Sequence, residues 1–62
     1  MKRTEIWVEL ECGGEFAWLG KDGQAWQCLT PHPELALFAT VEAAFAASAP
    51  EGWTAHVRQT RY

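Results

Sequence analysis

The segment Thr4–Cys12 alternates apolar and polar side chains, and this alternation constrains the fold more than any other feature of the sequence. Ile6, Val8 and Leu10 occupy every second position, and glutamates and Trp7 occupy the positions between them. A period of two residues is typical of a β-strand that buries one face and exposes the other. The segment therefore predicts a strand whose aliphatic face needs a covering layer.

The residues that follow predict a β-hairpin over Glu15–Thr30. Two apolar runs flank the sequence Gly20–Gly23, whose Asp-Gly pair favours the positive φ of a tight turn. Two prolines in residues 31–33 cannot continue a central strand, because proline lacks the N–H that a ladder needs. A single helical turn is expected over Glu34–Phe38, where the chain crosses from the sheet to the helix.

An alanine-rich segment, residues 41–48, predicts a short helix. Thr40 is a suitable N-cap, and Glu42 lies in the first turn, where the helix dipole favours a carboxylate. Residues 53–62 alternate again and predict a last strand. The expected buried face of the helix, at i, i+3, i+4 and i+7 spacing, consists of Val41, Ala44, Phe45 and Ser48.

These elements fit a single domain. A chain of 62 residues has room for one core only, and 48% hydrophobic residues exclude intrinsic disorder. A short helix and a one-sided sheet bury their apolar faces only against each other. We expect an α+β fold over residues 1–62, with a small antiparallel sheet of 3–4 strands and one helix on one face, in the order β-β-β-α-β. The expected core is Ile6, Val8, Leu10, Phe16 or Leu19, Trp26, Leu37, Phe38, Val41, Phe45, Trp53 and Val57.

The charges of the chain are unevenly placed. The formal net charge is −3, and four of the five bases lie near the ends of the chain. Between Thr4 and Val57 the sequence has one base, Lys21, and all eight acids, a formal charge of −7. This stretch repels nucleic acid and anionic membranes and attracts a basic protein surface. No signal peptide or apolar membrane-spanning run is apparent, so we expect a cytoplasmic protein without a membrane partner.

Four residues have the side chains of a zinc site, Cys12, Cys28, His32 and His56. Fifteen residues separate the cysteines and twenty-three separate the histidines, which is far from the spacing of structural zinc ligands. Both thiols are expected to be reduced and buried, although the sequence leaves a bridge between them open. We predict no metal, no cofactor and no enzymatic activity, and a small enzyme or metal protein is the least favoured hypothesis.

The polar side of the first strand is the candidate binding site. Alternate side chains on a strand are about 6.7 Å apart, and two steps along a DNA strand are about 6.8 Å. Glu5, Glu9 and Glu11, with Glu15 beyond them, could therefore imitate a short row of phosphates. The predicted partner-binding residues are Glu5, Trp7, Glu9, Glu11, Glu15, Asp22, Glu34 and Glu42.

Two alternatives stand beside this hypothesis. Arg58 or Arg61 could lie across the sheet from the glutamates and neutralise them. Trp7, a candidate anchor because tryptophan is enriched at interface hot spots, could instead pack against Trp18. Neutralised glutamates would undermine the imitation of nucleic acid.

The first fourteen residues, MKRTEIWVELECGG, resemble the opening of small anti-CRISPR proteins of phages and mobile elements, in particular inhibitors of type I-C systems. Residues 30–40, with the alanine-rich segment after them, are similar to many short phage proteins. The resemblance implies a non-enzymatic inhibitor that binds the Cascade surveillance complex and blocks target DNA by DNA mimicry. We expect it to act as a monomer in the host cytoplasm. The alternative is a small phage structural or regulatory protein that pairs through a strand edge with a host protein or with itself.

Overall fold

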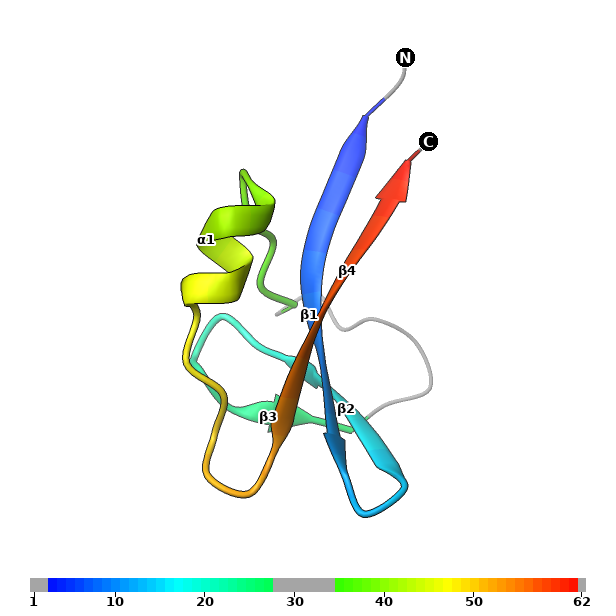
Figure 1. Ribbon diagram of the computed structural model, residues 1–62, viewed down its shortest axis with the longest axis vertical. Helices are drawn as coiled ribbons and strands as arrows, with labels where there is room; N and C mark the ends of the chain where they lie inside the picture. The colour runs from blue at the N-terminus through cyan, green and yellow to red at the C-terminus, as the bar shows by residue number, and fades with distance from the viewer. Residues whose placement is uncertain (1–2, 28–34, 62) are drawn as a thin grey trace.

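A computed structural model describes residues 3–27 and 35–61 of the protein (Figure 1). Its four strands form one antiparallel sheet in the order β3-β2-β1-β4, and one short helix precedes the last strand. The elements are β1 (Thr4–Cys12), β2 (Glu15–Leu19), β3 (Ala25–Trp26), α1 (Val41–Ala46) and β4 (Thr54–Arg61). The predicted α+β class and element order are confirmed.

Strand β1 lies inside the sheet, between β2 and β4, and its alternation sets which face is buried. Ile6, Val8 and Leu10 are 6%, 1% and 0% exposed, as predicted. Gly13 and Gly14 form the two-residue turn into β2, and both have positive φ, which suits glycine. The aliphatic side of β1 faces the helix layer, which we call the inner face, and the other side is the outer face.

The predicted hairpin is confirmed by the pairing of β2 with β3, although β3 has only two residues. The predicted hairpin extends to Thr30, and its residues 28–30 lie outside the described residues. The same holds for Glu34, the first residue of the predicted helical turn. The helical turn expected over Glu34–Phe38 is wrong for residues 35–38. That segment is bound to the sheet instead, because Ala36 N–H donates to the Leu19 carbonyl (3.0 Å) and Phe38 N–H to the Ile6 carbonyl (2.8 Å).

Helix α1 begins as predicted, since the Thr40 hydroxyl accepts a hydrogen bond from Ala43 N–H at 3.1 Å. It ends at Ala46, two residues early, because Ala47 is already extended. The helix buries Ala44 and half-buries Val41. The predicted face is therefore wrong at Phe45, which is 72% exposed, and at exposed Ser48. In the described residues no helix is long and apolar enough to cross a membrane.

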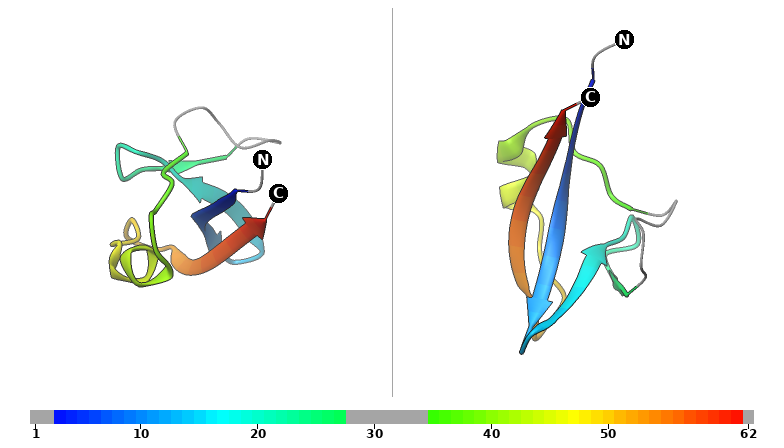
Figure 2. Two further views of the ribbon diagram at one scale, coloured as in Figure 1. Left: turned by 90° about the horizontal axis from the view of Figure 1, so that it is seen from above. Right: turned by 90° about the vertical axis from the view of Figure 1, so that its right-hand side faces the viewer.

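The core is small and lies between the sheet and the layer formed by α1 and residues 35–40 (Figure 2). Its side chains are mostly aliphatic. Of the alternatives Phe16 and Leu19, Leu19 is buried at 4% exposure and Phe16 is 57% exposed, and the expected Leu37 is wrong at 54% exposed. Phe16 faces outward because it pairs with Glu11, an outer-face residue. Of the remaining expected residues, Trp26, Phe38, Val41, Trp53 and Val57 are half-buried. The buried core is Ile6, Val8, Leu10, Ala17, Leu19 and Ala44.

Candidate functional site

The outer face of the sheet collects aromatic and charged side chains from all four strands. Residues paired directly across an antiparallel sheet share a face, so the register alone defines its members. They are Glu5, Trp7, Glu9 and Glu11 from β1, Phe16 and Trp18 from β2, Trp26 from β3, and Thr54, His56, Arg58 and Thr60 from β4.

The middle glutamate of this face is ion-paired. Arg58 donates from Nη2 and Nε to Oε1 of Glu9, at 2.9 and 3.3 Å. The Glu9 side chain is only 20% exposed. The row of carboxylates that could imitate phosphates is therefore neutralised at its centre, and the alternative in which Arg58 is the neutralising residue is confirmed.

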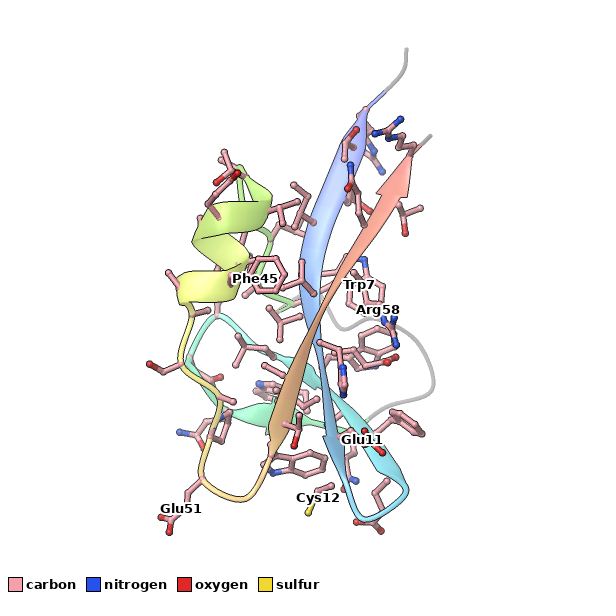
Figure 3. The ribbon with its side chains drawn as sticks, viewed as in Figure 1. Trp7, Glu11, Cys12, Phe45, Glu51 and Arg58 are labelled. Atoms are coloured by element: carbon pink, nitrogen blue, oxygen red, sulfur yellow. The ribbon has the colours of Figure 1, made fainter. Side chains whose placement is uncertain are left out.

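The two flanking glutamates also have partners. Nε2 of His56 lies 3.2 Å from Oε1 of Glu11, and Nη2 of Arg3 lies 3.7 Å from Oε2 of Glu5. Figure 3 shows Glu11 near the turn end of β1, with Arg58 further along toward the chain ends. Arg61 takes no part, because it is paired with Thr4 at the far end of β1. Glu11 is the most open of the three carboxylates, with 42% of its side chain exposed.

Trp7 packs against Trp18 from the neighbouring strand. Their ring centroids are 4.7 Å apart and the ring planes are tilted by 59°. The alternative in which the two rings cluster is thus confirmed, and both residues remain half-buried rather than covered. Because Phe16 and Trp26 share this face, aromatic surface extends over β1, β2 and β3.

The other predicted site residues lie elsewhere. Glu15 is paired with Cys12 and so belongs by register to the inner face, where it is exposed. Glu42 is exposed in the first turn of α1, on the opposite layer. Glu34 lies outside the described residues. The structure therefore does not join Glu15 or Glu42 to the carboxylates of β1.

Asp22 lies in the turn between β2 and β3, where it organises the turn. Its Oδ1 accepts a hydrogen bond from Nε1 of Trp26 at 3.1 Å and another from Gln24 N–H at 3.0 Å. These bonds, the Trp26 bond first, lower the pKa of Asp22. The carboxylate thus supports an outer-face ring rather than extending the row of glutamates.

The prediction that both thiols are buried is wrong at Cys12. Cys12 is an exposed free thiol, because it is the last residue of β1 before the turn and extends past the covering layer. Cys28 and His32 lie outside the described residues. Within residues 3–27 and 35–61, no group of three or more metal-binding side chains comes together.

Five outer-face residues were missed as site candidates: Phe16, Trp18, Trp26, His56 and Arg58. The alternation of residues 53–62 puts His56 and Arg58 on the polar side of that strand. Their contact with the glutamates follows only from the pairing of β4 with β1.

Comparisons with protein-family models, with curated proteins and with solved structures find no match for this chain. The candidate site is accordingly defined by the geometry of the outer face.

Proposed function

We propose that the protein is a non-enzymatic inhibitor that binds a basic protein surface through its outer face. The resemblance to anti-CRISPR proteins supplies the partner class, a Cascade subunit whose basic surface holds target DNA. One observation carries the proposal: aromatic rings and carboxylates share one sheet face, and Phe16 on it is 57% exposed.

Arginine is the side chain that this combination fits best. A guanidinium can stack on an aromatic ring and donate hydrogen bonds to a carboxylate in the same contact. Trp7 and Trp18 provide a ring pair already packed in place. Glu11 lies directly opposite Phe16 on the neighbouring strand, and its carboxylate is half-exposed. Preorganised aromatic side chains lose little conformational freedom on binding, which favours affinity.

The internal ion pair changes how the surface would act. Because Arg58 already neutralises Glu9, the glutamates of β1 do not form a continuous row of free negative charges like that of DNA phosphates. In our proposal the rings supply most of the affinity, and Glu11 orients the partner's basic groups. Binding would weaken with added salt less steeply than binding by charge imitation alone.

The test is a DNA-binding assay with purified type I-C Cascade and a target duplex. The protein should lower the fraction of DNA bound, and Phe16→Ala and Glu11→Lys should each weaken this inhibition about tenfold, a loss of about 1.4 kcal/mol. Phe45→Ala and Glu42→Lys are matched controls on the helix layer and should inhibit like the wild type. Failure of the folded protein to bind Cascade, or equal effects of site and control variants, would reject the proposal.

A further inference from the structure

Strand β4 is a long edge of the sheet. Among the residues that the structure describes it pairs only with β1, and it runs for eight residues without proline, lysine or glycine. Among the described residues, no backbone hydrogen bond reaches its other side. Unpaired strand edges of this kind are templates for a further strand, and proteins commonly protect them with prolines, lysines or bulges.

The direction of the free backbone groups follows from one hydrogen bond. The Ile6 carbonyl accepts from Phe38 N–H, on the side of β1 away from β4. In an antiparallel pair, alternate residues point toward the partner strand. Glu5, Trp7, Glu9 and Glu11 therefore bond to β4 at their partners Thr60, Arg58, His56 and Thr54. The N–H and C=O groups that point away from β1 are those of Ala55, Val57, Gln59 and Arg61.

A second observation concerns the helix beside this edge. The Phe45 ring is 72% exposed, and in Figure 3 it points from α1 toward the β1–β4 pair. Ala55 is exposed and Val57 half-buried, and both lie on the inner face of β4, the face on which the helix lies. A strand added to β4 would place its own inner-face side chains against these apolar groups.

We propose that the free edge of β4 pairs with β4 of a second copy, antiparallel about a two-fold axis, with Val57 opposite Val57 of the other copy. The two sheets would join into one sheet, with both helices on the same side of it. Phe45 of each copy would then be covered by the inner-face side chains of the other copy. This symmetric arrangement is the commonest form of homo-oligomer. It replaces the monomer expected from the sequence, which does not reveal that β4 is an edge.

The sequence of β4 favours a second copy and selects this register. The residues whose backbone groups point away from β1 must face one another, so the two-fold axis passes through a residue. Val57 and Arg58 are the two residues at the middle of β4, where an axis pairs most of the strand. An axis at Arg58 would place two arginines directly opposite, which is destabilising. An axis at Val57 places valine against valine, Thr54 against Thr60 and Ala55 against Gln59. It also places His56 against Arg58, each of which already contacts a glutamate of β1. Threonine pairs and apolar pairs are favourable across strands.

The dimer is tested by sedimentation equilibrium over a range of concentrations. The wild type should reach twice the 7.0 kDa mass of one chain. Gln59→Pro should be monomeric and folded, because its N–H points away from β1 and proline is tolerated on an edge. Phe45→Glu should weaken the dimer at least tenfold without unfolding, since the ring is exposed. Phe16→Glu, the matched control on the outer face, should dimerise like the wild type.

Amide hydrogen exchange gives a readout that a general loss of stability does not mimic. The amides of Val57 and Gln59 should be protected only at concentrations where the dimer forms. Those of His56 and Arg58, bonded to β1, should be protected at all concentrations. A wild type that stays at 7.0 kDa up to millimolar concentration overturns the proposal, as does a dimer that survives both Gln59→Pro and Phe45→Glu. A monomer that binds only a foreign strand at β4 also overturns it. None of these outcomes depends on Cascade binding.

Discussion

Arg58 and Glu9 join the last strand to the first across 49 positions of the chain, through two hydrogen bonds to one carboxylate oxygen. The pair is diagonal in the sheet, since Glu9 lies directly opposite His56 and Trp7 opposite Arg58. It turns what the sequence presents as an acidic strand into a locally neutral surface. The outer face is therefore distinguished by its rings more than by its charge.

The Glu9–Arg58 pair should contribute little to stability, because the Arg58 side chain is 52% exposed and water screens it. A double-mutant cycle with Glu9→Gln and Arg58→Ala, measured by urea unfolding, should give a coupling free energy of about 0.5 kcal/mol. The coupling should fall further in 1 M salt, a concentration at which the Debye length is about 3 Å. A coupling above about 2 kcal/mol would contradict this assignment.

Leu10→Ala should remove a large part of the protein's stability. Leu10 is fully buried, and such substitutions destabilise by about 2–5 kcal/mol through lost burial and the cavity left behind. A domain of 62 residues has a free energy of unfolding of roughly 3–9 kcal/mol. Leu37→Ala is the matched control, because Leu37 is 54% exposed, and it should change stability by less than about 0.5 kcal/mol. Equal losses in the two variants, measured by urea unfolding, would refute the assigned core.

The sequence predicted the strand faces well because the signal is local. In β1 every second residue is aliphatic, and only one assignment of faces buries all three. The ion pair with Arg58 could not be predicted in the same way, because it depends on which strand lies beside β1 and in what register. Both are set by the packing of the whole sheet rather than by the period of either strand.

The error at Phe45 has a different physical cause. Alanines surround Phe45 in α1, so several faces of this short helix are almost equally apolar. The i, i+3, i+4 spacing selected the face that contains Phe45, the one aromatic residue of the helix. The structure places the small Ala44 against the sheet instead. A helix of six residues with few large side chains carries too little pattern to fix its own rotation.

Gly20→Ala should disturb the turn between β2 and β3 because of space rather than backbone conformation. A Cβ at Gly20 would collide with Nε1 and Cδ1 of the Trp26 indole. Moving that ring would break its hydrogen bond to Asp22, and overpacking of this kind is destabilising by about 1–3 kcal/mol. Urea unfolding of Gly20→Ala in wild-type and Trp26→Ala backgrounds measures the clash. The penalty should be much smaller in the second background, where only Oδ1 of Asp22, at 2.9 Å, stays close to the added Cβ. A penalty of equal size in both would exclude Trp26 as its cause.

Trp26 should also control the titration of Asp22. Its indole N–H donates to the Asp22 carboxylate, which lowers the pKa below the ordinary value of 3.8. Because this pKa is lowered in the folded state, the stabilisation is fully present above 3.8 and is lost as the pH falls through the folded pKa. In an NMR titration of the carboxyl carbon, Trp26→Phe should raise the pKa of Asp22 toward 3.8. Trp53→Phe, a change of the same kind next to β4, should leave it at the wild-type position. A pKa of Asp22 that is the same in all three proteins would show that the indole hydrogen bond does not form in solution.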